Sequence, residues 1–378
     1  MKPPIYLDYN GTTPLDSEVI ETMLPFLKSD FGNPSSGHAY GRRPRAAVAE
    51  ARQQVADLLG CRPEEIIFTS GGTEANNHAL KGILMVDHRG GHIITSAIEH
   101  PAVLEVCRFL ERFGVKTTYL PVDGRGQVDP GAVKAAIRPD TRLISIMHAN
   151  NEVGTLQSVA QMAAIARDHG IAIHTDAAQS VGKVATRVDD LGVDLLSVAG
   201  HKLYAPKGVG VLYVRSGLAL ENFCHGAGQE HGRRAGTENV ALIVALGKAC
   251  EIAARELDRH RRHMQTMRER LHQGLAGGLE GVILNGHPDQ RLPNTLSLAF
   301  TGIDANRLLA AVQNTIAASA GAACHADSVA ISHVLEAMQI PEDLARGTVR
   351  FSVGRTTTPE EIDRALPVLV QAVTRLRQ

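Results

Sequence analysis

The chain has 378 residues, of which 44% are hydrophobic and 21% are charged, and its formal net charge is -1. This is the composition of a globular protein with enough chain for two domains. The near-zero charge, the 4% aromatic content and the lack of tryptophan argue against a nucleic acid as partner. No apolar run has the length of a membrane span, and MKPPIYLDYNGTTP lacks the apolar stretch of a signal peptide, so we expect a cytoplasmic protein that binds no membrane.

Strand-like and helix-like segments alternate between about residues 64 and 215. Apolar runs typical of strands cover 65–70, 92–96, 116–122, 141–149, 171–177, 194–200 and 208–214. Helix-like patterns between them cover 73–85, 100–114, 129–137 and 159–170. Most of the runs are apolar throughout rather than alternating, which predicts a mostly parallel sheet with helices on both faces.

The pattern changes after Gly236. A long helix-like stretch runs from about residue 239 past 270, and apolar runs at 281–286, 294–300 and 348–354 follow, with helices near 304–312 and from TPEE onward. We predict a smaller α+β domain here, which the N-terminal PIYLDYNGTTP is expected to join. The expected division is 14–257 for the large domain, and 1–13 with 258–378 for the small domain.

Polar residues follow the predicted strands of the first sheet. They are Thr69 to Thr73, Glu99 and His100, Asn150 to Glu152, Asp176 and Gln179, and His201 and Lys202. Ligands bind at the carboxyl ends of the strands in sheets of this kind. We therefore expect these side chains to share one site.

Lys202 lies in SVAGHKLYAPKGVG, just after a predicted strand and among small and apolar neighbours. A buried lysine tends to lose its proton, and the neutral amine is a nucleophile toward carbonyl carbon. The alternative is a solvated lysine at a strand end.

Three further motifs each allow a functional and a structural interpretation. FTSGGTEAN predicts a strand, a small-residue turn and a helix start that could hold an anion or be a plain cap. In HTDAAQS, Asp176 would be poorly hydrated and would seek a cation, or it caps the strand. His100, before a proline at a helix start, is by itself typical of a helix-capping or core histidine.

The five cysteines, Cys61, Cys107, Cys224, Cys250 and Cys324, are scattered and form no CxxC pair, which argues against a disulfide framework and a zinc site. Cys324 lies in SAGAACHADS, whose small residues predict an exposed loop and a reactive thiol rather than inert packing. A lysine for a Schiff base, an aspartate for a protonated ring nitrogen and a helix N-terminus for a phosphate are together the partners that pyridoxal phosphate needs.

The set of motifs resembles the cysteine desulfurases of the NifS/IscS type, within the class-V aminotransferases, and the closely related selenocysteine lyases. The resemblance covers nearly the whole chain and is carried by YLDYNGTTP, GNPSSGHAYG, TSGGTEANN, EHPAVL, NNEVGTLQ, HTDAAQSVGK, GHKLYAPKGVG, GTENV, GAACHADS and VRFSVGRTTT. It implies an α/β protein of fold type I, a pyridoxal-phosphate-dependent transferase in which a mostly parallel mixed sheet lies between helices, with a smaller α+β C-terminal domain.

The resemblance also implies a role for individual residues of this chain. Lys202 forms the Schiff base with the cofactor, His100 stacks on its ring and moves protons, and Cys324 takes the sulfur. The implied cofactor contacts are Asp176 to the ring nitrogen, Gln179 to the ring hydroxyl, Gly72, Thr73 and His201 to the phosphate, and Thr237 to the phosphate of the neighbouring subunit of a homodimer. Arg350 binds the substrate carboxylate with the help of Asn33 and of Asn151, which also belongs to the cofactor site.

The implied reaction converts L-cysteine to L-alanine and leaves a persulfide on Cys324. The sulfur then passes to an acceptor protein, such as an iron–sulfur scaffold or a tRNA-thiolation protein. Two positions depart from the pattern: Ala199 replaces a common phosphate-binding serine, and HADSVAIS follows Cys324 in place of a Ser/Thr-rich segment. A selenocysteine lyase acting on L-selenocysteine, an aminotransferase and a non-catalytic sulfur-transfer scaffold are the alternatives.

Overall fold

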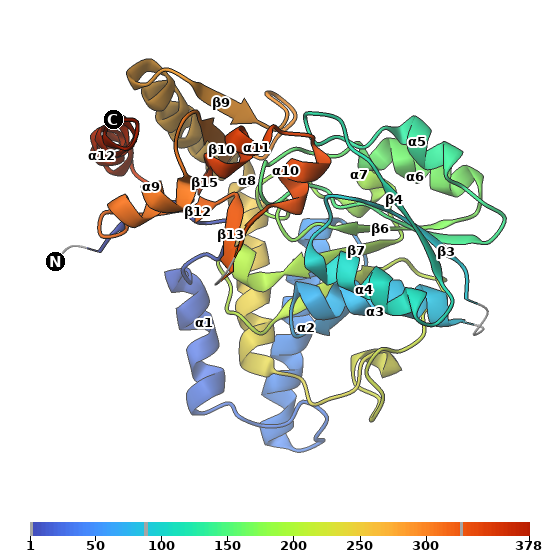
Figure 1. Ribbon diagram of the computed structural model, residues 1–378. Helices are drawn as coiled ribbons and strands as arrows, with labels where there is room; N and C mark the ends of the chain where they lie inside the picture. Colours follow the sequence, from blue (N-terminus) through green and yellow to red (C-terminus); the bar gives the residue numbers. More distant parts are fainter. Residues whose placement is uncertain (1–2, 87–89, 326–327) are drawn as a thin grey trace.

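The chain folds into two regions joined by one long helix. The computed structural model describes residues 3–86, 90–325 and 328–378, and from 322 to 330 it describes the backbone alone. Figure 1 shows a larger layered region, with a smaller region beside it that contains the N-terminal strand and the C-terminal helix. Within these described residues no helix is both long and apolar enough to cross a membrane.

The larger region is built on a seven-stranded sheet with the order β2-β8-β7-β6-β5-β3-β4. Its strands are β2 (Ile66–Thr69), β3 (His92–Ser96), β4 (Lys116–Leu120), β5 (Thr141–Ser145), β6 (Ala172–Asp176), β7 (Leu195–Ala199) and β8 (Gly210–Val214). All neighbours pair in parallel except β8, which is antiparallel to both β2 and β7. The predicted mostly parallel mixed sheet is therefore confirmed.

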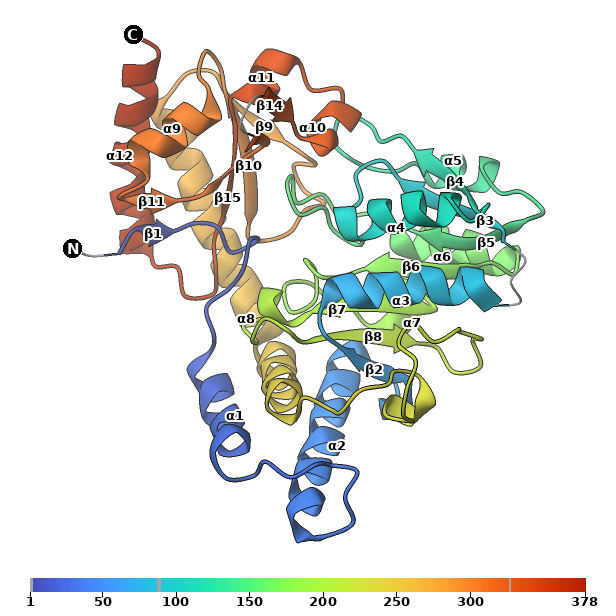
Figure 2. The ribbon, with the colours of Figure 1, turned by 60° about the horizontal axis from the view of Figure 1, so that its bottom comes forward.

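Helices cover both faces of this sheet, as Figure 2 shows. Ile93 packs with α3 (Gly72–Met85) and α4 (Pro101–Glu111), whereas the next residue, Ile94, packs on the opposite face in the cluster that contains α6 (Val159–Asp168). Successive strand side chains point to opposite faces, so a sheet covered twice needs apolar residues at every position. This explains the uniformly apolar runs in the sequence, and it leaves only the strand ends for polar residues.

The remaining helices of the larger region are α1 (Ser17–Lys28), α2 (Ala39–Leu59), α5 (Pro130–Ala135) and α7 (Val188–Leu191). The sequence analysis did not predict α1 and α2. In α2 the buried residues Val48, Ala51, Val55 and Leu59 recur at helical spacing and form one apolar stripe. The stripe packs against α8. The helical spacing of its apolar residues was therefore present in the sequence and could have predicted α2.

The smaller region contains a four-stranded antiparallel sheet with the order β12-β15-β10-β9. Its strands are β9 (Val282–Asn285), β10 (Thr295–Phe300), β12 (Ser319–Ala320) and β15 (Thr348–Ser352), and its helices are α9 (Ala305–Val312), α10 (His333–Ala337), α11 (Glu342–Arg346) and α12 (Pro359–Leu376). The N-terminal β1 (Ile5–Tyr6) pairs in parallel with β11 (Ile316–Ala317). This pairing places residues 5 and 6 beside the smaller region, while the predicted domain division stays a prediction.

The long helix α8 (Val240–Gly278) runs through both regions (Figure 2). Leu246 in its first half belongs to the core of the larger region, and Leu271 in its second half belongs to the core of the smaller one. The predicted domain boundary at residues 257 and 258 lies inside this helix, and it stays a prediction.

The segment around Cys324 was predicted to be a loop, but its backbone forms an antiparallel hairpin. Strand β13 (Ala322–His325) pairs with β14 (Ser328–Ile331), with Cys324 opposite Val329. Ladder hydrogen bonds satisfy the backbone groups of small residues without side-chain packing, so small residues do not by themselves exclude a strand. The predicted exposure of the Cys324 side chain falls outside the described part of the chain.

A substitution at Gly210 tests how tightly the sheet holds the turn before α3. A Cβ at Gly210 would lie 2.6 Å from the carbonyl carbon of Gly71 and 2.6 Å from the carbonyl oxygen of Val198. Gly210→Ala should therefore displace this turn and lower the free energy of unfolding by about 1–3 kcal/mol, measured by urea unfolding. In Gly37→Ala, the control, the added Cβ would meet no heavy atom within 4 Å. An equal loss in both variants would contradict this packing argument.

Candidate active site

A cavity of about 300 Å³ lies at the carboxyl ends of the strands of the large sheet. Nine of the twelve predicted site residues line this cavity: Gly72, Thr73, His100, Asn151, Asp176, Gln179, His201, Lys202 and Arg350. The residues that the sequence analysis did not assign to the site are Asn10, Gly11, Asn76, Ala102, Met147, Ala149 and Ala178. The structure thus brings together side chains from both regions of the fold.

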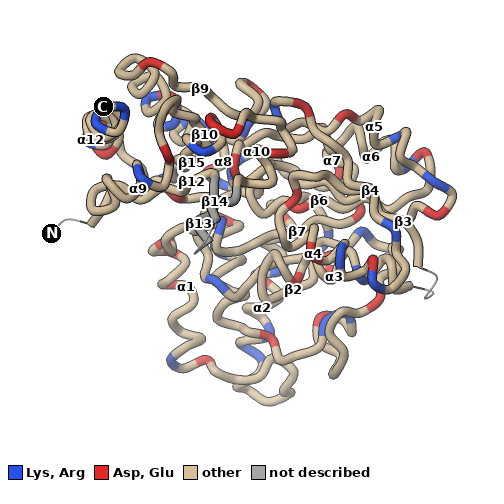
Figure 3. Tube along the Cα trace, viewed as in Figure 1, with Lys and Arg blue, Asp and Glu red and all other residues tan. Residues whose placement is uncertain are grey.

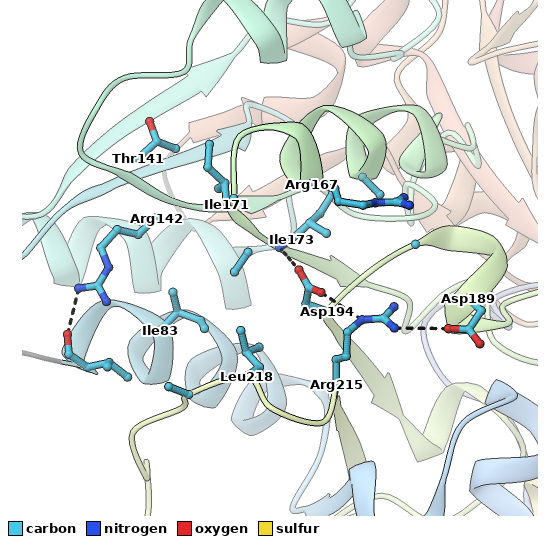
Figure 4. Close-up of a pocket in the computed structure, with 16 residues that line it drawn as sticks. Ile83, Thr141, Arg142, Arg167, Ile171, Ile173, Asp189, Asp194, Arg215 and Leu218 are labelled. Atoms are coloured by element: carbon cyan, nitrogen blue, oxygen red, sulfur yellow. Dashed lines mark hydrogen bonds and ion pairs between the residues drawn. The ribbon is translucent and has the colours of Figure 1, made fainter.

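A larger cavity of about 720 Å³ lies at the amino ends of the parallel strands β5, β6 and β7, at the other end of the sheet from the first cavity (Figure 4). Its charged side chains mostly bond to one another or to the backbone. Arg215 pairs with Asp194 at 3.1 Å and with Asp189 at 3.4 Å. Basic and acidic positions are interspersed along the trace in Figure 3, so charge alone does not mark a site. The smaller cavity carries the nucleophile, acid and base types that catalysis needs.

Lys202 reaches the cavity because the chain turns tightly after β7. A Cβ at Gly200 would lie 2.8 Å from the carbonyl oxygen of Val209, so the turn has no room for a side chain there. The Lys202 Nζ donates to the carbonyl oxygen of Gly11 at 2.7 Å and to that of Asn10. Burial, together with the nearby charge of Arg350, lowers the pKa of Lys202 to about 8. Near neutral pH the amine can therefore give up its proton readily and act as a nucleophile.

Asp176 ends strand β6 and is 7% exposed. Its carboxylate accepts hydrogen bonds from Asn76 Nδ2 at 2.7 Å and from the Ala178 N–H at 2.9 Å. Asn76 lies in the second turn of α3, and its buried Oδ1 has no partner among the described side chains. The carboxylate is held in place from two sides and can face a cationic group in the cavity.

The start of α3 and His201 form the side of the cavity whose N–H groups are suited to an anion. The first N–H groups of a helix have no partner within it, and Gly72 and Thr73 are the first residues of α3. Burial and the nearby Lys202 lower the pKa of His201 to about 4, so its ring is neutral at pH 7. Ala199 also lines the cavity, with its Cβ 3.2 Å from where a Cβ on Gly72 would lie.

His100 both caps a helix and lines the cavity, and the role that the resemblance implies for it stays a prediction. Its Nδ1 accepts from the Ala102 N–H at 3.1 Å, which assigns the proton of the neutral ring to Nε2. Desolvation lowers the pKa of His100; Asp176 opposes this shift and Lys202 adds to it. Glu99 precedes His100 in the chain and is buried. Its burial raises the pKa of the carboxyl group to about 8, so this group is mostly protonated at pH 7.

Arg350, on β15, brings a guanidinium from the smaller region to the cavity. Its Nη2 donates to Asp8 Oδ1 at 2.8 Å and to Ser319 Oγ at 3.1 Å, and its Nη1 donates to the Asn151 carbonyl at 3.1 Å. The buried Nε has no partner among the described residues. Asp8 was not predicted, because only the pairing of the N-terminal segment with the smaller region brings it here.

Three predicted site residues do not line the cavity. Asn33 is exposed between α1 and α2, where its Oδ1 accepts from the Ser35 N–H at 2.9 Å. Thr237 is exposed just before α8. The side chain of Cys324 lies outside the described residues. The roles implied for these three residues remain predictions.

Comparison with known proteins identifies the family. The sequence model of the aminotransferase class-V family matches residues 5–365. The chain is 48% identical to the cysteine desulfurase IscS of Dictyoglomus turgidum, over 100% of this chain and 96% of that protein. It is 44% identical to the human cysteine desulfurase, over 99% of this chain and 83% of that protein.

Solved structures agree with this assignment. A NifS-like protein superposes with a TM-score of 0.93 at 37% identity and covers 99% of this chain and 100% of that one. A structure described as SspA in complex with cysteine has a TM-score of 0.83 at 37% identity and covers 93% of this chain and 99% of that one. The chain belongs to the class-V aminotransferase family, in its cysteine desulfurase branch. The prediction of a cysteine desulfurase-type enzyme is thereby confirmed.

The pKa of Lys202 can be measured through its reactivity in the protein freed of any cofactor. A small aldehyde with borohydride labels only the neutral amine. Because the Lys202 pKa is lowered to about 8, labelling should rise steeply up to pH 8 and then level off. An ordinary lysine would continue to rise until about pH 10.4. Peptide mass spectrometry measures the extent of labelling.

Arg350→Gln provides the control for this measurement. Because the guanidinium contributes to the lowered pKa of Lys202, its removal should move the labelling midpoint to higher pH. A midpoint near pH 10 in the parent protein would show that burial does not lower the pKa of this lysine.

Proposed function

We propose that this chain converts L-cysteine to L-alanine with pyridoxal phosphate as cofactor, and that Cys324 carries the released sulfur as a persulfide. The observation that carries the proposal is the convergence on one cavity of an amine of lowered pKa, a carboxylate, a helix start and a guanidinium. The relative described in complex with cysteine supports the choice of substrate.

The residues of the cavity match the groups of the cofactor. The Lys202 amine would bond its aldehyde carbon, and Asp176 would pair with its ring nitrogen. Gln179 would bond its ring hydroxyl, while the start of α3 and His201 would hold its phosphate. The buried Asn76 Oδ1, which has no partner among the described side chains, fits a site completed by a bound group. When bound, the cofactor withdraws electrons from the substrate α-carbon.

The side chains of the chain itself orient the substrate and move its protons. A guanidinium suits a carboxylate, and the buried Arg350 Nε has no partner among the described residues. The Asn151 carbonyl and Asp8 already hold Arg350 from two sides, so its fork has a fixed direction. The amine of Lys202 would take the α-proton, because its lowered pKa leaves it able to be neutral near pH 8. The neutral ring of His100 would donate a proton rather than accept one, because its Nδ1 accepts from a backbone N–H and its Nε2 carries the proton.

Sulfur transfer to Cys324 balances without an external oxidant. The Cys324 thiolate attacks the sulfur of L-cysteine, a sulfur–sulfur bond forms and the carbon–sulfur bond breaks. The electron pair of the broken bond stays on carbon, which takes up a proton and becomes the methyl group of alanine. The persulfide then passes its outer sulfur to the thiol of an acceptor protein, and an iron–sulfur scaffold is the acceptor class that we propose.

We further propose a homodimer in which Thr237 completes the site of the partner subunit. The segment before Thr237 is anchored by the buried Glu230, whose carboxylate accepts from Arg52 at 2.7 and 2.9 Å and from the Phe68 N–H at 3.0 Å. Positive φ angles at Glu230 (49°) and His231 (57°) bend the chain there. This arrangement leaves Thr237 exposed, so that it is available to a second copy.

Mixing two impaired variants tests the shared site. Lys202→Ala and Thr237→Ala should each lose activity alone. A mixed dimer contains one site with Lys202 from one subunit and Thr237 from the other, so refolding the variants together should restore activity. Light scattering measures the mass of the parent protein. A fully active monomer would contradict the proposal.

The substrate and the role of Cys324 are tested together. We expect the parent protein to release alanine and sulfide from L-cysteine in the presence of a thiol. Cys324→Ser should abolish alanine formation from L-cysteine and keep the visible absorbance of the bound cofactor, since Lys202 is intact. Selenium is the better leaving group, so the same variant should keep part of its activity on L-selenocysteine.

Cys61→Ser is the matched control and should keep the parent activity. If Cys324→Ser still forms alanine from L-cysteine at the parent rate, the persulfide mechanism is wrong. A parent protein that forms alanine and selenide from L-selenocysteine alone would instead identify a selenocysteine lyase.

A further inference from the structure

A second lysine, Lys183, is buried behind the cavity and has no part in the mechanism above. It is 4% exposed and lies in the turns that follow β6. Its Nζ donates to Gln179 Oε1 at 2.9 Å, and this is its one hydrogen bond to the described residues. The space beside it measures about 10 Å³, which is about the room that one water requires. Gln179 is therefore the main polar partner of a buried cation.

This contact decides which end of the Gln179 amide faces the cavity. A glutamine amide has an acceptor end and a donor end, and either can be presented. An ammonium group can only donate, so it fixes Oε1 on its own side. The Nε2 of Gln179 then points the other way and donates to the Asn10 carbonyl at 3.0 Å. That carbonyl also accepts from Lys202, so the Gln179 NH₂ group lies beside the nucleophilic amine.

The orientation is enforced by the ammonium form of Lys183, because a neutral amine could also accept from the NH₂ end of the amide. Burial, together with the charges of Lys202 and Arg350, lowers the pKa of Lys183 to about 7. A carbonyl oxygen as neighbour favours the ammonium form, whereas the NH₂ end of the amide would repel it. A flipped Gln179 would also present its oxygen to the Asn10 carbonyl, which is an acceptor, so both contacts oppose the flip.

We propose that Lys183 is a positioning residue that locks the Gln179 amide with its NH₂ group toward the ring oxygen of the cofactor. The inference rests on the proposed function, because it assumes that pyridoxal phosphate binds in this cavity. The ring oxygen accepts hydrogen bonds when it is ionised, so only a donor stabilises it. Lys183 thus determines whether Gln179 offers the cofactor a hydrogen-bond donor or an acceptor, and it does so without touching the cofactor.

The test is a double-mutant cycle on cofactor affinity. Cofactor-free protein is titrated with pyridoxal phosphate, and the dissociation constant and the visible absorbance of the bound form are recorded. Lys183→Met should weaken binding about tenfold and shift the absorbance band, because one of the two contacts that hold the amide orientation is lost and only the Asn10 carbonyl remains. In a Gln179→Leu background, Lys183→Met should change the dissociation constant by less than about twofold, because no amide remains to orient.

Gln179→Glu is the matched control, since it keeps Lys183 paired with an oxygen but offers the cavity no donor. It should weaken cofactor binding about tenfold while the urea midpoint of the cofactor-free protein stays at or above that of the parent. If Lys183→Met does not fold, the dissociation constant of Gln179→Glu alone tests the proposal.

The outcomes separate this inference from the proposed function. Equal losses from Lys183→Met in both backgrounds, no loss in the parent background, or parent-like affinity of Gln179→Glu would each overturn the positioning role alone. A parent protein that does not bind pyridoxal phosphate would overturn the proposed function, and this inference with it.

Discussion

The hydrogen bonds of Asn10 join the two regions of the molecule at the candidate active site. Its carbonyl accepts from Lys202 and Gln179, which belong to the large sheet and its connections. Its side-chain Nδ2 donates to Thr295 Oγ1 at 2.8 Å, on β10 of the smaller region, and to the Asn151 carbonyl at 3.0 Å. The cavity exists only where these elements meet, so its geometry depends on the N-terminal segment lying between the two regions.

The net charge of the cavity depends on which of its buried ionisable groups are charged at neutral pH. Lys202 and Arg350 line it and Lys183 lies behind it, against the carboxylates of Asp176 and Asp8. Glu99 and His201 have shifted pKa values and are neutral at pH 7. The two lining cations therefore face two carboxylates, and Lys183, with a pKa lowered to about 7, is only partly charged at neutral pH.

Residues next to strand ends were predictable, because the apolar run and the polar residue that follows it are adjacent in sequence. Asp176 and Lys202 were found in this way. Asp8 and Asn10 reach the site only through the pairing of β1 with β11, more than three hundred positions away, and no local pattern marks them. The hairpin at Cys324 was missed for another reason: small residues carry little preference between loop and strand. Helix α2 had a clear periodicity that was not used.

Helix α8 has 39 residues and contains neither glycine nor proline between Gly247 and Gly274. Each residue of an α-helix turns the chain by about 100° and advances it by about 1.5 Å. One face of this helix packs in the core of the larger region and, further along, another stretch packs in the core of the smaller one. A single inserted or deleted residue in the middle would therefore rotate one core against the other and move Arg350 away from Lys202. The length of α8 thus fixes the rotation of the smaller region relative to the larger one, and with it the position of Arg350 relative to Lys202.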